Sequence, residues 1–309
     1  MVDRFLSFEI IFFSMNVLNN LNLDAAKKIF FSKDNVETYL TELNNLKNIN
    51  LNFKEITRGK NNGKKVLDMT NEELWNKVIS SWNYNSSLKL IRDLFKKSKK
   101  YQNGKIAKQR YIELVKEWDN LKLGLIKWPC SQGAFDEFVQ RVNNSNAMNK
   151  DEIVKKASVQ YRRMKELNTV RNDFLEIEIF EKNNNILPTL NHSRGTDYFI
   201  NGESFDQKVA KSPTKEFMKT YGDNWKDEAI KHPEKVAEYL YKYQDEGRFG
   251  ADSRILIVYL DEDVDLEKIE ETINKINLNK PLKVNFTYNH ARVGVKSYIV
   301  ECFVIVLLN

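Results

Sequence analysis

The chain contains 309 residues, of which 41% are hydrophobic and 12% aromatic, and it carries a formal net charge of +6. This composition is sufficient for one large packed domain or two of ordinary size, and the low counts of five Pro and eleven Gly argue against long disordered linkers. Cys130 and Cys302 are too far apart in sequence to suggest a disulfide framework or a zinc site, while the positive charge favours a polyanionic partner without requiring one.

The first apolar run extends from Phe5 to Phe13. It is interrupted by Glu9, it is not followed by a small-residue cleavage site, and it is shorter than the roughly 20 apolar residues that span a bilayer. We therefore expect a cytoplasmic protein that is neither secreted nor associated with a membrane.

Residues 1–148 are predicted to be mostly helical. Thr70-Asn71-Glu72-Glu73 has the pattern of a capping box before an apolar run, and apolar residues then recur at helical spacing as far as Trp118. The polar stretch from Asn143 to Asn149 marks a boundary. We therefore expect a helical N-terminal region, 1–148, followed by a second domain, 149–309.

The second domain alternates helices and strands. A helix is expected from Lys150 to about Lys182, and further helices are expected from Pro213 to about Gln244. The apolar run from Arg254 to Leu260 is typical of a strand buried on both faces. The remaining elements are expected to be a helix at 265–276 and two strands at 283–288 and 296–308. This pattern predicts an α/β fold with a mixed central β-sheet flanked by helices.

The segment from Arg194 to Lys208 is predicted to form a β-hairpin around Asn201-Gly202, the preferred two-residue turn. The period of two along a strand places Asp206 and Lys208 on one face, and the turn brings them back toward Asp197. Two adjacent carboxylates need a compensating positive charge, and oxygen ligands suit Mg²⁺. The alternative is a surface hairpin with ordinary charges.

An Asp followed, across a hairpin, by an acidic residue, any residue and a Lys resembles the catalytic motif of the PD-(D/E)XK nuclease superfamily, which includes many type II restriction endonucleases. Asp197, Asp206 and Lys208 match its three signature positions, while Thr196 stands where that family often has Pro. The resemblance implies a restriction-endonuclease-like core in 149–309, Mg²⁺-dependent hydrolysis of double-stranded DNA, and a homodimer. Asp197 and Asp206 would then bind the metal.

The same superfamily often adds a Glu from the helix before the first Asp. The resemblance favours Glu176, whereas helical geometry puts Glu178 at the edge of the apolar stripe that contains Phe174 and turns Glu176 away from it. The alternation from Leu175 to Ile179 also fits a strand with both Glu side chains on one face. Both residues remain candidates, against the alternative of a solvated helix face.

Several basic residues are candidates for contacts with DNA. Guanidinium groups suit both phosphates and base edges, although each could instead form a structural ion pair. The candidates are Arg194, Arg248, Arg254 and Lys211. Basic runs at 58–65 and 96–110 would position a duplex without reading its sequence, which makes region 1–148 a candidate for recognition. The competing hypothesis is a non-catalytic DNA-binding or partner-binding module with a degenerate nuclease fold, and a structure-specific nuclease is a third possibility.

Overall fold

A computed structural model of the protein divides the chain into two compact units, one made of Met1–Lys100 with Phe180–Asn309 and the other of Tyr101–Ile179. The residues that it describes are 21–47, 71–117, 121, 123–127, 130–193, 195–244, 252–261, 264–290 and 294–309. These units differ from the division at residue 148 expected from the sequence. The first helices of the chain belong with the sheet because two of them pack against its first strand.

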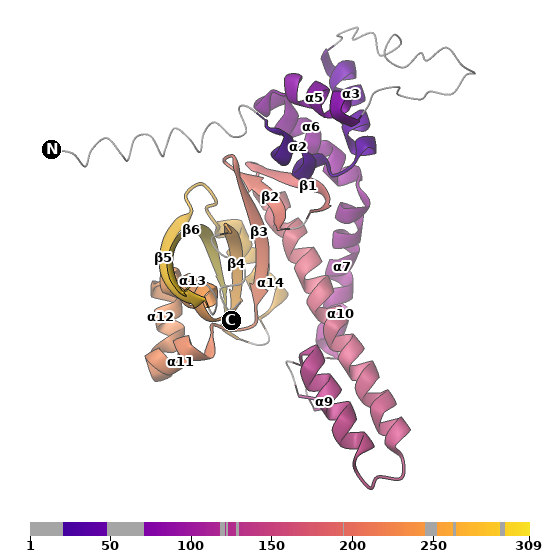
Figure 1. The fold of residues 1–309 in the computed structure, drawn as a ribbon, viewed down its shortest axis with the longest axis vertical. Coiled ribbons are helices and arrows are strands. Elements are labelled where there is room, and N and C mark those ends of the chain that lie inside the picture. Colours follow the sequence, from indigo (N-terminus) through magenta and orange to yellow (C-terminus); the bar gives the residue numbers. More distant parts are fainter. Residues whose placement is uncertain are drawn as a thin grey trace, which may run out of the picture. The chain divides into compact units, whose positions relative to one another are not determined.

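A six-stranded mixed sheet organises the described part of the first unit, with the strand order β1-β2-β3-β4-β6-β5 (Figure 1). Strands β1, β2 and β3 are antiparallel neighbours, β3, β4 and β6 are parallel, and β5 returns antiparallel to β6. The expected mixed central sheet is therefore confirmed. The strand bounds are β1 Ile186–Ser193, β2 Thr196–Ile200, β3 Glu203–Ala210, β4 Arg254–Tyr259, β5 Leu282–His290 and β6 Gly294–Leu307.

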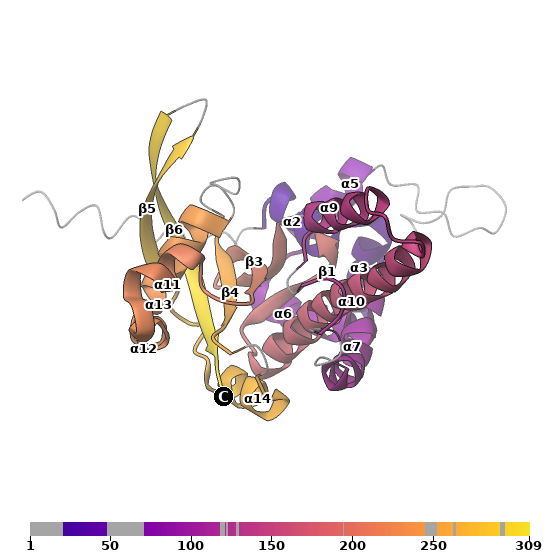
Figure 2. The same ribbon diagram turned by 90° about the horizontal axis from the view of Figure 1, so that it is seen from below.

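Short helices between β3 and β4 cover part of this sheet. They build a common core with Ala210, Leu256 and Val258, and Figure 2 shows them beside β5 and β6. Helix α14, Leu266–Lys275, packs against β6 and buries Ile269 and Ile273. The short elements are α11 Lys215–Tyr221, η1 Gly222–Asn224, α12 Trp225–Lys231, α13 Pro233–Tyr239 and the π-helical turn η2 Leu240–Gln244.

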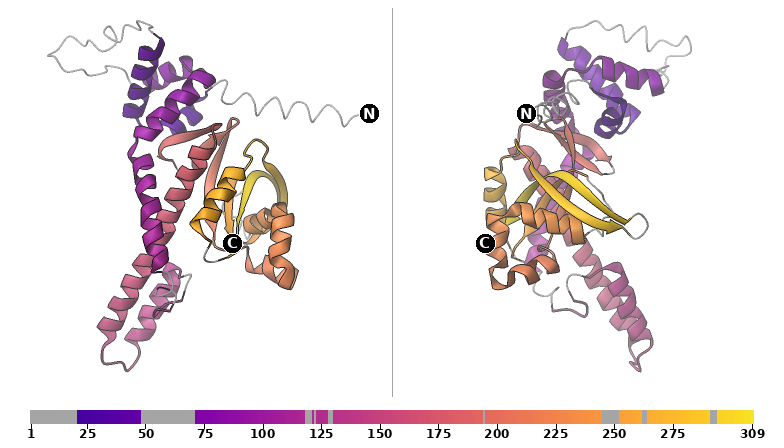
Figure 3. Two further views of the ribbon diagram at one scale, coloured as in Figure 1. Left: turned by 180° about the vertical axis from the view of Figure 1, so that it is seen from behind. Right: turned by 60° about the vertical axis from the view of Figure 1, so that its left-hand side comes forward.

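A group of N-terminal helices completes the first unit. Asn22 and Asn83 accept hydrogen bonds from backbone N–H groups in the first turns of α2 and α6, which fixes where these helices begin. Both helices pack against β1, and α3 and α5 pack against them (Figure 3). The bounds are α2 Leu23–Phe30, α3 Lys33–Lys47, α5 Asn71–Ser80 and α6 Tyr84–Lys97. The expected helical character of the N-terminal region is confirmed for the described residues.

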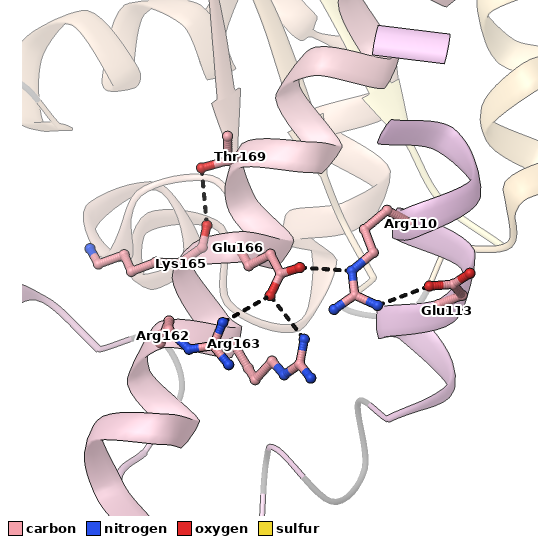
Figure 4. A network of polar contacts seen from close by, with 7 residues as sticks. All are labelled: Arg110, Glu113, Arg162, Arg163, Lys165, Glu166 and Thr169. Carbon is pink, nitrogen blue, oxygen red and sulfur yellow. Dashed lines mark hydrogen bonds and ion pairs between the residues drawn. The ribbon is translucent and has the colours of Figure 1, made fainter. Parts of the chain in front are cut away.

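The second unit contains α9, Gln132–Asn143, and most of α7, Lys99–Lys116, and α10, Lys150–Lys182. Arg110 of α7 donates to Glu166 of α10 at 2.7 Å and to Glu113 at 2.8 Å, while Arg163 also donates to Glu166 at 3.0 Å (Figure 4). The hydrogen bond from Arg110 is the main reason that the pKa of Glu166 is lowered. This partly buried network holds α7 beside α10.

The C-terminal half of α10 is helical throughout, so the alternative of a strand from Leu175 to Ile179 is wrong. Every residue from Phe174 to Phe180 is buried, including Glu176 and Glu178. The expectation that Glu176 faces away from the buried side is therefore also wrong. A single apolar stripe predicts one buried face, but this part of the helix is covered on all sides.

Helix α7 lies close to α10 at Gly104. A Cβ atom at this position would lie 2.2 Å from Cγ1 of Ile177 and 3.1 Å from the carbonyl oxygen of Asp173. Gly104→Ala is therefore expected to destabilise the protein by about 2 kcal/mol in chemical denaturation, because buried Ile177 has little room to move. Gly133→Ala in α9 is the control, since its Cβ would meet nothing within 4 Å. Equal stability of the two variants would contradict this packing.

None of the described helices is both long and apolar enough to cross a membrane. The apolar run from Phe5 to Phe13 lies outside the described residues.

Candidate functional site

The predicted β-hairpin is present and carries the candidate residues on β2 and β3. Its turn residues Asn201 and Gly202 have φ angles of 51° and 95°, the positive values that a two-residue turn of this kind requires. Strand register then follows from the turn, with Phe199 opposite Ser204 and Tyr198 opposite Phe205. Continuing this register by one residue places Asp197 opposite Asp206, as the sequence predicted.

Asp197 lies at the point where β2 and β3 stop pairing through their backbones. Its Oδ2 atom accepts a hydrogen bond of 2.8 Å from the backbone N–H of Gln207. Residues that face each other across antiparallel strands point to the same side of the sheet. The two carboxylates of Asp197 and Asp206 therefore share one face, and Asp197 is held against β3 by a contact of its own.

The electrostatic environment of Asp206 reflects this proximity. Burial is the largest cause that raises the pKa of Asp206, and the negative charge of Asp197 is the second. Arg254 and Lys208 oppose this shift without cancelling it, and Asp252 adds to it. The folded protein thus places Asp206 where an additional positive charge would be stabilised.

Arg254 is the cross-strand neighbour of Asp206 on the parallel strand β4. Only 3% of its surface is exposed, and its guanidinium carbon lies 5.4 Å from the centre of the Tyr241 ring. Tyr241 comes from η2 and donates a 2.9 Å hydrogen bond to the carbonyl oxygen of Asp252. Burial is the main cause that raises the pKa of the Tyr241 hydroxyl. Because Arg254 is buried, the structure favours a structural role for it beside Asp206 over a contact with DNA.

Lys208 follows Asp206 by two residues on β3, so both side chains lie on the same face. Lys208 is partly buried, and its positive charge acts on Asp206. Lys211 lies just beyond the end of β3 and is also partly exposed. The three residues of the predicted motif, Asp197, Asp206 and Lys208, are thus brought together by two adjacent strands.

A second contact supports Asp197 from the other side of β2. Lys100, which is buried, donates to the hydroxyl of Thr189 in β1 at 3.3 Å. Thr189 is fully buried and donates in turn to the backbone carbonyl of Asp197 at 3.2 Å. This chain of hydrogen bonds connects the α6–α7 junction to the backbone of the first candidate metal ligand.

The remaining residues predicted for the site lie in the second unit or outside the described residues. Glu176 and Glu178 belong to the second unit, where Glu178 accepts a 3.0 Å hydrogen bond from Lys108. Arg194, Arg248 and the basic run at 58–65 lie outside the described residues. Sequence reasoning missed Tyr241 and Asp252, because nothing local links the end of a helical segment to a hairpin distant in the chain.

The donor set is compatible with a hard cation. Asp197 and Asp206 offer carboxylate oxygens on one face, and burial followed by the charge of Asp197 raises the pKa of Asp206. Within the described ranges, no group of three or more His, Cys, Asp or Glu side chains is arranged to hold a metal ion. Two carboxylates suffice for Mg²⁺, which keeps several of its waters in proteins.

Comparisons with known proteins leave the family of this chain open. No protein-family model matches it, and neither a curated protein nor a solved structure does.

Proposed function

We propose that the protein is a Mg²⁺-dependent endonuclease that hydrolyses phosphodiester bonds in double-stranded DNA, as a type II restriction enzyme does, and that it acts as a homodimer. The observation that carries this proposal is the convergence of Asp197 and Asp206 on one face of β2 and β3, with Lys208 beside them. This is the arrangement expected from the resemblance to PD-(D/E)XK nucleases.

The topology around the hairpin supports a restriction-endonuclease-like core. Helix α10 is followed by three antiparallel strands, by helices, and by β4 parallel to β3. The core of PD-(D/E)XK nucleases has this same order of elements: helix, strand, strand, strand, helix, strand. The common alternative for two neighbouring carboxylates, a solvated surface pair, is disfavoured by the partial burial of Asp206.

In this proposal Asp197 and Asp206 hold Mg²⁺ through their carboxylate oxygens. The bound cation would supply Lewis-acid stabilisation of negative charge on the phosphate. Lys208 orients the attacking water and stabilises the charge that develops on the phosphoryl oxygens. The water oxygen would form a bond to phosphorus while the bond to one sugar oxygen breaks. The water's proton would pass to solvent, and the departing sugar oxygen would take a proton from solvent. Arg254 lies opposite Asp206 on the neighbouring strand, and its positive charge favours the ionised form of the Asp206 carboxyl.

The direct test is incubation of the purified full-length protein with unmethylated plasmid DNA and Mg²⁺. Discrete fragments are expected with the natural protein, and none with EDTA or with Asp197→Ala. Asp223→Ala, at an exposed position in η1, is the matched control and should cut normally. Cleavage by the Asp197→Ala variant would show that this site does not carry out the reaction.

The same assay separates the competing functions. A non-catalytic module would bind the plasmid without cutting it, whether or not Asp197 is replaced. A structure-specific nuclease would leave the plasmid intact and cut branched or single-stranded DNA offered beside it. A homodimer would show twice the chain mass in sedimentation velocity, as expected for two sites acting across a palindrome.

A further inference from the structure

A cavity of about 610 Å³ that is open to solvent lies within the second unit, between α9, the start of α10 and the loop before α9. Pockets of this size enclose most of the surface of a small-molecule ligand. Helix α9 contributes four lining residues at helical spacing, Ala134, Phe138, Arg141 and Val142. The others are Leu125, Ile126, Lys127, Cys130, Ser145 and Ile153.

Helix α9 has an apolar face that the protein covers only in part. Phe135 stacks on Tyr161 of α10 with ring centres 4.6 Å apart, and Tyr161 donates to Gln132 at 3.0 Å, so one edge of α9 is attached to α10. The neighbouring stripe with Phe138 and Val142 borders the cavity and is only partly buried. None of the residues of α9, all of which are described, is fully buried. Apolar surface beside a cavity of this size favours an apolar occupant.

The loop on one side of the cavity is held in place by Gln160 of α10. The Nε2 atom of Gln160 donates to the backbone carbonyls of Leu121 at 2.6 Å and Ile126 at 2.9 Å, and Oε1 accepts from the N–H of Ile126 at 3.1 Å. A Cβ atom at Gly124 would lie 2.3 Å from the side-chain amide of Gln160, so the close approach requires glycine. This wall of the cavity is therefore ordered before any ligand binds, which lowers the entropic cost of binding.

The polar groups around the cavity are of two kinds. The neutral ones already have partners, since the hydroxyl of Ser145 donates to the carbonyl of Val142 at 2.7 Å and the thiol of Cys130 donates to the carbonyl of the following residue at 3.5 Å. The charged ones are Lys127 and Arg141, which are exposed and form no ion pair or hydrogen bond with any described residue. No described residue that lines the cavity is acidic. The cavity thus combines an apolar wall with two uncompensated positive charges.

We propose that this cavity binds an aliphatic carboxylate of the fatty-acid class, with its alkyl chain against the apolar wall and its carboxylate beside Arg141 and Lys127. The apolar lining is aliphatic apart from Phe138. An alkyl chain buried there leaves no polar group of the ligand without a partner. A guanidinium group receives a carboxylate through two parallel hydrogen bonds. All of the lining residues belong to the second unit, so binding there does not depend on the proposed nuclease activity.

A second copy of the chain is the other occupant to consider, because Leu125, which lines the cavity, is 47% exposed. In a symmetric dimer the same patch lies on both sides of the contact. Lys127 and Arg141 of one copy would then lie near those of the other, and no acidic side chain among the described lining residues would compensate them. Charge therefore favours an anionic small molecule.

Cys130 provides a reporter at the cavity wall. It is partly exposed, whereas Cys302 is fully buried, and burial raises the pKa of the Cys302 thiol to about 12. Because the thiolate is the reactive form, iodoacetamide should alkylate Cys130 of the folded full-length protein and leave Cys302 unmodified. Octanoate bound in the cavity should cover Cys130 and slow its alkylation at least about ten-fold at saturation, since the reaction depends on access to the sulfur.

Two further ligands separate the contributions of the chain and of the charge. Decanoate should bind about ten-fold more tightly than octanoate, because it buries two more methylene groups. Octan-1-ol, which has the same chain length as octanoate and no charge, should bind at least about ten-fold more weakly than octanoate. Each affinity is read from the ligand concentration that halves the alkylation rate at fixed pH.

Variants of the lining residues test the same division. Arg141→Gln should weaken protection by octanoate about ten-fold and leave protection by octan-1-ol unchanged, because only the carboxylate uses the guanidinium group. Val142→Asn should weaken protection by both ligands, because it places an amide in the apolar wall. Lys155→Gln, at an exposed position of α10 outside the cavity lining, is the matched control and should behave as the natural protein. Unmodified Cys302 in each variant shows that the variant is folded.

The proposal is wrong if saturating decanoate gives no protection, if octanoate and octan-1-ol protect equally, or if Arg141→Gln is protected as well as the natural protein. It is also wrong if Cys130 becomes protected as the protein concentration rises and sedimentation velocity shows a dimer that Val142→Asn dissociates, because the cavity is then a contact between copies. These measurements contain no DNA, so the nuclease proposal stands or falls separately in the plasmid assay.

Discussion

Replacing Asp206 with Asn is expected to stabilise the folded protein in the absence of divalent cations and to abolish the proposed cleavage. Burial, and then the charge of Asp197, raises the pKa of Asp206 in the folded protein. The ionised carboxyl is therefore less favourable in the folded chain than in the unfolded chain, and its charge lowers stability. Asn keeps the shape and removes the charge, but it is a far weaker ligand for Mg²⁺.

The effect on stability has a definite pH dependence. Below the pKa of an unfolded Asp, about 3.9, Asp206 is neutral in both states and the charge costs nothing. The cost grows as the pH rises from this value through the raised pKa of the folded carboxyl, and it is constant at higher pH. The gain in stability from Asp206→Asn should therefore increase from acid toward neutral pH.

Thermal unfolding in EDTA across this pH range measures the first effect, and plasmid cleavage in Mg²⁺ measures the second. We expect the melting temperature of Asp206→Asn to exceed that of the natural protein by a few degrees at neutral pH, with cleavage reduced at least about 10²-fold. Asp223→Asn at the exposed η1 position should change neither quantity. A less stable Asp206→Asn protein at neutral pH would show that the carboxylate is favourably paired in the fold.

Replacing Arg92 with Met is expected to cause a large loss of stability. Arg92 of α6 donates to the carbonyl oxygens of Asn183 at 3.0 Å, Ile186 at 2.7 Å and Phe180 at 3.0 Å. Its guanidinium carbon also lies 4.1 Å from the centre of the Phe180 ring. One side chain thus donates to backbone carbonyl groups at the end of α10 and the start of β1. Its loss should lower the free energy of unfolding by about 3 kcal/mol.

Chemical denaturation of the full-length protein measures this loss. Arg92→Lys should recover only part of the stability, because an ammonium group cannot reach three carbonyls in the planar geometry of the guanidinium fork. Lys89→Met, at an exposed position on the same helix, is the control for replacing a cation with Met, and it should hardly change the free energy of unfolding. If Arg92→Met matched Lys89→Met, the three hydrogen bonds would make no net contribution.

Features that depend on neighbouring residues could be predicted without a structure. Asn201-Gly202 specifies a turn in which both residues have positive φ, so the hairpin and the facing of Asp197 and Asp206 follow from local chemistry. The apolar run at 254–260 similarly predicts a buried strand, observed as β4. Helix α10 was predicted with its observed bounds because its helical pattern extends over many turns.

The sequence by itself therefore determined the local elements and the candidate pair of carboxylates. Only the tertiary structure decided that Arg254 stands beside Asp206, that Tyr241 covers Arg254, and that the N-terminal helices pack with the sheet. It also decided that β5 pairs with β6 at one edge of the sheet. Pairing between distant strands depends on the packing of the whole core, which the periodicity of a single segment does not encode.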